Sequence, residues 1–244
     1  MAGRFLELGL AVPDILESLH FYRTLGFTEL AVGEVWPHKY AVVTDGTLFI
    51  GLHEDPVASP VVTLVQHSLR RHVLTLQDAG TEFVETRLGE DEFNRAVLRD
   101  PDGTAVMLVE ARTYSPAPET PAASLLGECL ELALPVRDAL AAAHFWAPLA
   151  PRLAAHREEP EPRFRLAVDG LVLGLGTRPA LARPLLVYRV TDAMALQAAL
   201  DRLGVYPGAG PDLPGESRGT IRAPEGTDIA LLKADYWTDN GADS

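Results

Sequence analysis

The stretches LELGLAVPD (6–14) and LELALPVRD (130–138) both alternate large apolar residues with small or polar ones. Alternation with a period of two is the pattern of a half-buried β-strand. In each predicted strand the leucines share one face, and a glutamate, Glu7 or Glu131, stands on the other. A carboxylate in such a strand must meet water, a partner or a ligand, because burying an unpaired charge is costly.

Helical and hairpin patterns follow the first strand. Asp14 is predicted to cap a helix that ends at Gly26, since aspartate is a strong N-cap residue and glycine ends helices. Asp45-Gly46 lies between two apolar stretches and predicts a hairpin. A second helix is predicted at 68–78, and further strands at 40–44, 48–53, 61–66, 93–99 and 104–110.

The whole pattern occurs twice, at an offset of 124 residues that shortens to 123 near the end. HFY at 20–22 recurs as HFW at 144–146, DG at 45–46 as DG at 169–170, and PDG at 101–103 as PEG at 224–226. A constant offset over many landmarks indicates a tandem duplication. We predict modules at 1–113 and 125–235, a linker rich in proline and small residues at 114–124, and a polar tail at 236–244.

Composition narrows the class of protein. The 244 residues are 47% hydrophobic and carry a net charge of −13, which argues against nucleic-acid or anionic-membrane partners. The only cysteine, Cys129, excludes an internal disulfide, and no stretch is typical of a signal peptide or a membrane span. We therefore expect a soluble cytoplasmic protein, as a monomer or a homodimer.

Three motifs resemble those of the vicinal oxygen chelate superfamily, which includes glyoxalase I, bleomycin-resistance proteins, fosfomycin-resistance enzymes and extradiol dioxygenases. They are VPD followed by HFYRTLGF (20–27), LFIGLHE (48–54) and RDPDGTAVMLVE (99–110). The resemblance covers both modules. It implies an α+β fold in which two tandem βαβββ modules form a curved mixed sheet around a ligand cavity, with the helices outside.

The resemblance also indicates where metal-dependent members place their ligands. One ligand of each set matches a glutamate of the first strands, but the other two match aliphatic residues, methionine or alanine. A divalent metal prefers several oxygen or imidazole ligands, so we predict no metal and no other cofactor, with a divalent metal as the alternative. The matching positions are Glu7 and Glu131, about Val61 and Leu185, and Met107 and Ala230.

The cavity side of the predicted sheets offers candidates for chemistry. Apolar neighbours are expected to raise the pKa of a glutamate and suit it to acid–base work, so Glu7, Glu131 and His53 are predicted to be catalytic. Because Trp36 and His38 have no counterpart in the second module, one dominant pocket is expected. The predicted lining residues are Trp36, His38, Tyr40, Phe49, Thr63, Met107, Phe164 and Arg189.

Three functions remain open from the sequence. The first is sequestration of a small hydrophobic or aromatic molecule. The second is metal-independent proton transfer beside a carbonyl, as in an isomerase, epimerase or lyase, by Glu7 or Glu131 with His53 or His38. The third is a metal-dependent lyase or extradiol-type dioxygenase whose ligands are displaced, drawn from Glu7, His53 and His38.

Overall fold

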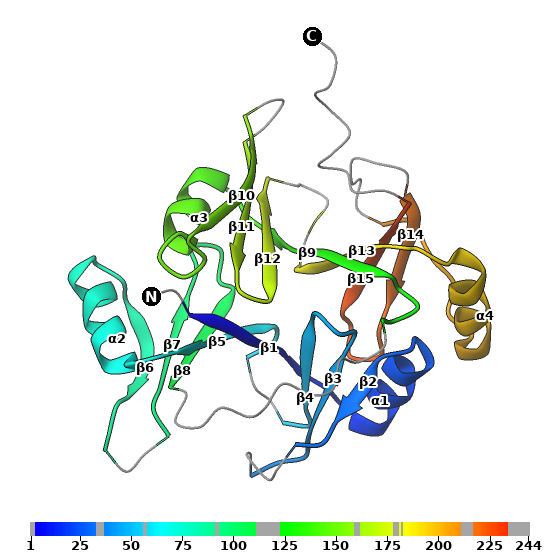
Figure 1. The fold of residues 1–244 in the computed structure, drawn as a ribbon, viewed down its shortest axis with the longest axis horizontal. Helices are drawn as coiled ribbons and strands as arrows, with labels where there is room; N and C mark the ends of the chain where they lie inside the picture. The colour runs from blue at the N-terminus through cyan, green and yellow to red at the C-terminus, as the bar shows by residue number, and fades with distance from the viewer. Residues whose placement is uncertain are drawn as a thin grey trace.

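A computed structural model describes most of the chain. The described residues are 3–32, 37–55, 58–90, 93–110, 123–158, 162–177, 181, 183–210 and 217–233. They form two mixed sheets with two helices each (Figure 1), so the predicted α+β fold of two tandem modules is confirmed. No helix in these ranges is long and apolar enough to cross a membrane.

Module 1 is built on an eight-stranded sheet in the order β2-β3-β4-β1-β5-β8-β7-β6. Strands β1 and β4 pair in parallel, as do β5 and β8, while the other neighbours are antiparallel. Its elements are β1 Arg4–Ala11, α1 Ile15–Thr24, β2 Thr28–Leu30, β3 Tyr40–Thr44, β4 Phe49–His53, β5 Val61–Gln66, α2 Leu69–Asp78, β6 Phe83–Arg87, β7 Arg95–Arg99 and β8 Ala105–Glu110.

Module 2 is built on a seven-stranded sheet in the order β10-β11-β12-β9-β13-β15-β14. Its elements are β9 Glu128–Pro135, α3 Ala139–Trp146, β10 Arg152–Arg157, β11 Arg163–Val168, β12 Leu171–Gly176, β13 Leu185–Arg189, α4 Ala193–Leu203, β14 Ser217–Arg222 and β15 Asp228–Leu232. Each module contains two strand–helix–strand units side by side, a doubling that the 124-residue offset does not reveal.

Local chemistry explains where the helices begin. The side chains of Asp14, Asp138 and Asp192 accept hydrogen bonds from the second and third backbone N–H groups of α1, α3 and α4. These caps satisfy donors that a helix cannot pair internally. The leucine face of β1 lies in the core that both modules share, where Leu8 and Leu10 are buried in the same cluster as Leu19 of α1. Glu7 therefore stands on the opposite, concave face.

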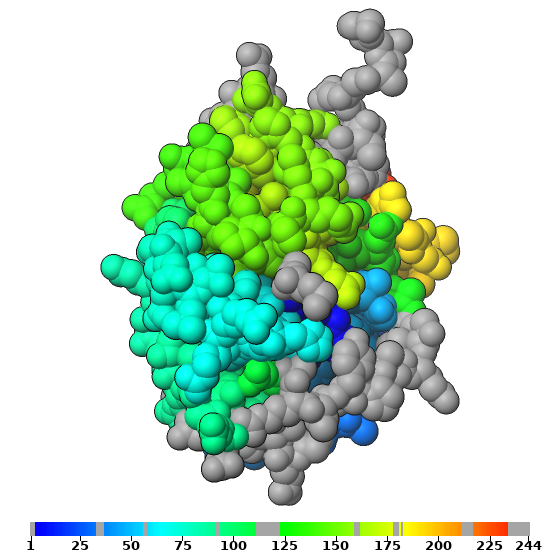
Figure 2. Space-filling model, turned by 60° about the vertical axis from the view of Figure 1, so that its left-hand side comes forward, coloured from blue at the N-terminus to red at the C-terminus, as the bar shows by residue number. Residues whose placement is uncertain are grey.

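The two modules share one core and contact each other directly (Figure 2). Helix α1 lies beside α4 of the other module (Figure 1). The Tyr22 hydroxyl of α1 donates to Glu225 Oε1 at 2.6 Å, and Trp146 Nε1 of α3, its equivalent at the 124-residue offset, donates to Asp100 Oδ2 at 3.3 Å. The contacts between the modules are therefore reciprocal.

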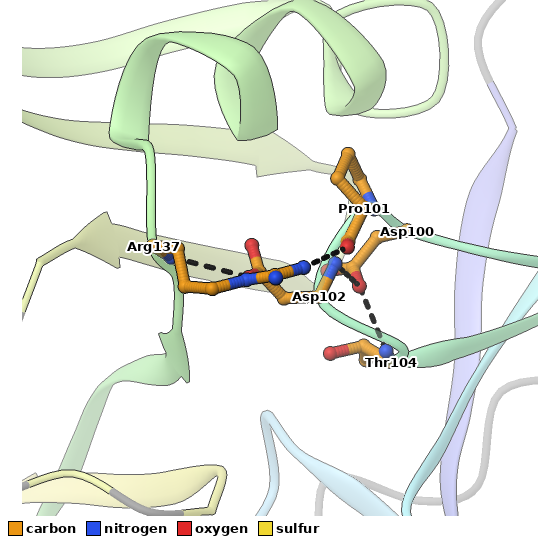
Figure 3. A network of polar contacts seen from close by, with 5 residues as sticks. All are labelled: Asp100, Pro101, Asp102, Thr104 and Arg137. Atoms are coloured by element: carbon orange, nitrogen blue, oxygen red, sulfur yellow. Dashed lines mark hydrogen bonds and ion pairs between the residues drawn. The ribbon is translucent and has the colours of Figure 1, made fainter.

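Figure 3 shows one of these contacts closely. Arg137, just before α3, donates from Nε to Asp102 Oδ1 and from Nη2 to the Pro101 carbonyl, both at 2.8 Å. Asp100 holds the same turn by accepting from the backbone N–H groups of Asp102 and Thr104. The Asp-Pro-Asp-Gly turn is thus a docking point for the second module as well as a strand connection.

Candidate functional site

Both glutamates of the first strands are buried on the concave faces. Glu7 is 4% exposed and Glu131 is 1% exposed. Each carboxylate lies over a glycine of the neighbouring strand. A Cβ added to Gly51 would lie 2.6 Å from Glu7 Oε2, and one added to Gly174 would lie 2.2 Å from Glu131 Oε1. Glycine in β4 and β12 is therefore what leaves room for the two carboxylates.

In module 1 the partners of Glu7 are a phenol and an imidazole. The Tyr40 hydroxyl makes a short hydrogen bond to Glu7 Oε2, and His53 Nε2 lies 3.6 Å from Glu7 Oε1. Tyr40 and His53 are cross-strand neighbours in β3 and β4, with ring centroids 4.7 Å apart. Burial and the negative charge of Glu7 raise the pKa of Tyr40 well above its usual range, so the phenol remains a donor.

The contacts continue from His53 to the surface. His38 Nε2 lies 2.9 Å from His53 Nδ1, and His38 Nδ1 lies 3.4 Å from Asp55 Oδ2. Side-chain exposure falls from 47% at Asp55 through 12% at His38 to 4% at His53 and 6% at Glu7. Two imidazoles therefore connect a half-exposed carboxylate with a buried one.

This relay, which comprises Asp55, His38, His53 and Glu7, places two imidazoles in a row between two carboxylates. The contact between the two imidazoles is within hydrogen-bond distance, whereas the 3.6 Å between His53 Nε2 and Glu7 Oε1 is longer than a hydrogen bond. Each imidazole has two ring nitrogens, one for each neighbour in the row.

The rest of the concave face of module 1 is mostly apolar. Strand register places Thr63 of β5 opposite Glu7 and Met107 of β8 beside Thr63. Thr63, not Val61, is therefore the second position of this row. The Thr63 Oγ1 atom is buried and has no hydrogen-bond partner among the described residues. Phe49 lies on the same face as Gly51 and His53, and it is partly exposed.

Module 2 surrounds its glutamate differently. Glu131 Oε2 accepts from Arg165 Nε at 2.6 Å, and both side chains are at least nine-tenths buried. The strand register places Val187 opposite Glu131, with Ala230 next in the row. A cavity of about 240 Å³ opens beside Glu131 and is also lined by Arg152 and Val172. Glu131 thus pairs with a permanent cation.

Two predicted lining residues, Phe164 and Arg189, do not join these groups. Phe164 packs on the helix side of the sheet and stacks on His156, with ring centroids 4.6 Å apart, so it does not line the concave face. Arg189 pairs with Glu128, and both side chains are about half exposed. Trp36 lies outside the described residues.

Sequence reasoning missed Arg165 and the part played by Asp55. The constant offset of 124 aligned Tyr40 with Phe164. In the strand register Tyr40 begins β3 opposite His53, and Arg163 begins β11 opposite Gly176, so Arg163 is the structural counterpart of Tyr40. The alignment was therefore one residue out in β11. The alternation Arg163, Phe164, Arg165 carried the signal, because two arginines in a strand must share a face.

Comparisons with solved structures find the same architecture over the whole chain. A catechol 2,3-dioxygenase matches with a TM-score of 0.63 and 14% identity, over 100% of this chain and 97% of that one. A 2,2',3-trihydroxybiphenyl 1,2-dioxygenase from Sphingomonas wittichii matches with a TM-score of 0.64 and 16% identity, over 97% and 94%. At identities of 14% and 16%, these matches show that the chain shares the fold of those proteins.

A glyoxalase from Novosphingobium aromaticivorans, described as Mn(II)-bound, matches with a TM-score of 0.60 and 14% identity, over 98% of this chain and 86% of that one. The fold that this resemblance implied is thus confirmed by structures of dioxygenases and of a glyoxalase. The chain matches no family model and no curated protein.

The comparisons contradict the prediction that the protein binds no cofactor. The fold of nearly the whole chain matches that of an Mn(II)-bound glyoxalase. The absence of a ligating side chain at two of the three matching positions in each module therefore does not justify that prediction. Within the described ranges, no three His, Cys, Asp or Glu side chains are grouped to hold a metal ion. Glu7 Oε1 and His53 Nε2 are nevertheless two suitable donors that approach each other, at 3.6 Å.

Proposed function

We propose that the concave face of module 1 binds a small aromatic or hydrophobic compound and transfers a proton to or from it. The relay of Asp55, His38, His53 and Glu7 carries this proposal, because it leads from a half-exposed carboxylate to a buried one. A structural role alone requires only one partner for Glu7, and Tyr40 already supplies it. The reaction class is an isomerase, epimerase or lyase type of proton transfer.

Each group has a distinct role in this proposal. Glu7 takes the proton from the bound compound, and His53 and His38 pass it on toward Asp55. Tyr40 stabilises the ionised form of Glu7 by donating to it. The buried hydroxyl of Thr63, which lacks a partner among the described residues, donates to an oxygen of the compound. Phe49 and Met107 contact its apolar part, as is usual in small-molecule sites.

An aromatic compound is favoured by the neighbours as well as by the lining. Two matching structures are named for catechol and for trihydroxybiphenyl, both hydroxylated aromatic compounds. The same face of module 1 presents Phe49 and Tyr40 near Glu7. An aromatic ring with a carbonyl or hydroxyl group therefore suits the combination of apolar walls and a buried relay.

A divalent metal would use the same two donors. Glu7 Oε1 and His53 Nε2 supply oxygen and nitrogen ligands, and Tyr40 and His38 hold these side chains from behind, as partners of metal ligands do. The described residues supply no third ligand of this group, so the remaining positions would be filled by water or by the bound compound. A bound metal would polarise an oxygen of that compound.

The test measures exchange of carbon-bound hydrogen with solvent. Aryl ketones and aryl hydroxyketones are incubated with the protein in D₂O, and deuterium incorporation is followed by NMR. His53→Gln and Glu7→Gln are expected to lose about 10²- to 10⁴-fold in rate, the usual contribution of acid–base groups. His20→Gln, which changes an exposed histidine on α1, is the matched control. Exchange that survives in both site variants would contradict the proposal.

A metal measurement sharpens the same test. Two protein donors predict weak binding, so Mn²⁺ in excess is expected to raise the melting temperature of the wild type modestly. The rise should disappear in Glu7→Gln and persist in Glu131→Gln. A rise that depends on Glu131 instead would move the metal to module 2.

A second candidate function is favoured by the names of the matching structures. It is a metal-dependent dioxygenase or lyase whose ligands are displaced to Glu7 and His53. The protein is first loaded with Fe²⁺ under anaerobic conditions. Oxygen uptake is then measured in aerated buffer with catechol, and it distinguishes this function from proton transfer. Uptake lost in His53→Gln would favour this candidate, and no uptake above free Fe²⁺ would exclude it.

A further inference from the structure

The concave face of module 2 is basic, although the chain as a whole carries a net charge of −13. Arg163 and Arg165 of β11 share this face, because they are two residues apart and Arg165 meets Glu131 there. Arg157 of β10 is directly opposite Arg163, and Arg152 is opposite Ala167, so both lie on the same face. Like charges that face each other across strands destabilise a sheet.

Arg163 is the residue whose charge calls for a partner. Its stem crosses Gly176, where a Cβ would lie 3.1 Å from Arg163 Cγ. Its Nε atom is buried and has no hydrogen-bond acceptor among the described residues. A buried donor of a guanidinium without an acceptor is costly, and native structures rarely leave one.

Within the part of the chain that the structure describes, the carboxylate nearest to Arg163 on this face is that of Glu131, which already pairs with Arg165. Arg163, Arg165 and Glu131 therefore sum to one positive charge on the concave face. An anion with oxygen acceptors is the ligand that a guanidinium pairs with most effectively.

Beside these charges the same face is apolar. The residues next to Glu131 across the sheet form a separate buried cluster. A cavity of about 240 Å³ lined by Glu131 and Arg152 touches this cluster at Leu130, at the end of β11 away from Arg163. The cluster consists of Leu130, Ala133, Leu181, Leu185, Val187, Ala230 and Leu232. A ligand that satisfies both surroundings has an anionic oxygen group and an apolar body.

We propose that module 2 binds an organic anion, with Arg163 holding its carboxylate or phosphate group and the apolar cluster holding its body. Arg163 occupies the position of Tyr40 in module 1, and Gly176 occupies the position of His53. This site therefore has no imidazole at the position that corresponds to His53. It is a binding site and not a second centre for proton transfer. It is independent of the function proposed for module 1.

The experiment is calorimetric titration of the full chain with benzoate, phenyl phosphate, inorganic phosphate and benzyl alcohol. Benzoate or phenyl phosphate is expected to bind, and the one that binds more tightly identifies the anionic group. Arg163→Gln is expected to weaken this binding at least about tenfold, since charge-assisted hydrogen bonds are lost. Arg202→Gln, which removes a charge at the end of α4, is the matched control.

The outcomes separate the two proposals. Binding that is lost in Arg163→Gln but kept in His53→Gln supports the site in module 2, whatever becomes of proton transfer in module 1. Absence of binding by both organic anions overturns the proposal. Binding of benzyl alcohol or inorganic phosphate as tight as that of the organic anions also overturns it, as does unchanged affinity of Arg163→Gln for those anions. If Arg163→Gln does not fold, Arg163→Lys decides, because it keeps the charge and loses the planar donors. Unchanged affinity in that variant also overturns the proposal.

Discussion

Glu7 and Glu131 occupy equivalent places in the two modules, yet the side chains around them differ in kind. Each carboxylate lies over a glycine of the neighbouring strand. Glu7 meets groups that can gain or lose a proton near neutral pH or donate one hydrogen, whereas Glu131 meets the permanent charge of Arg165. One duplicated frame therefore holds a carboxylate beside a phenol and an imidazole and a second carboxylate in an ion pair with a guanidinium.

The largest expected effect comes from removing the cation of module 2. Arg165→Met leaves Glu131 as a buried charge and should cost about 3–5 kcal/mol of unfolding free energy. Tyr40→Phe in module 1 should cost less, about 1.5–3 kcal/mol, because it removes a single hydrogen bond to a charge. Urea denaturation of both variants measures the difference.

A double variant checks the cause of that loss. Glu131→Leu combined with Arg165→Met should recover most of the stability, since a buried ion pair can be replaced by apolar residues. Equal losses in Arg165→Met and Tyr40→Phe would mean that the two carboxylates are held alike, and the comparison would fail.

The glycines under the carboxylates provide the next test. Gly174→Ala and Gly51→Ala should each cost about 1–3 kcal/mol, because the new methyl group enters the space of a carboxylate. The cost should be greater at Gly174, where Arg165 prevents the carboxylate from moving. Gly208→Ala is the control, since its Cβ would meet nothing closer than 4.0 Å. Thermal unfolding ranks the three variants.

The reciprocal contacts between the modules should have smaller effects. Tyr22→Phe removes the hydrogen bond to Glu225 but leaves that carboxylate partly exposed to water, so we expect a loss of about 1–2 kcal/mol. Restoring stability by a second change, Glu225→Gln, would show that the contact carries the loss. A loss in Tyr22→Phe that Glu225→Gln does not alter would assign it to packing instead.

The smallest expected effect concerns a histidine that module 2 replaces with leucine. Burial holds the pKa of His72 on α2 below its usual value, and Leu196 stands 124 residues later. The unfolded chain therefore binds the proton more readily, so stability is full above about pH 6.5 and falls as the pH drops below it. His72→Leu should flatten the stability profile between pH 7 and pH 5. An unchanged slope would assign the pH dependence to other groups.

The repeated landmarks acquire a meaning in the structure that the sequence did not reveal. Tyr22 and Trp146, found as a repeated pair, are the residues that reach across to the other module. The hairpin aspartates do the same, because Asp45 accepts from the Tyr188 hydroxyl at 2.6 Å and the Asp169 carbonyl accepts from the backbone N–H of Phe5 at 2.9 Å. The duplication thus preserved turns and the contacts that they make.

The sequence by itself determined the duplication, the α+β class and the face of the sheet that the two glutamates occupy. Period-two alternation, the Asp14 cap and the Asp-Gly turns act over a few residues, so they can be read without the fold. Only the tertiary structure decided the partners of those glutamates. Strand register differs from a constant offset wherever a strand bulges or a loop changes length, and it placed Arg165 beside Glu131. The bend before β3 placed His38 beside His53. Pairing across strands depends on such shifts of one residue, because a shift of one reverses the face that every side chain occupies.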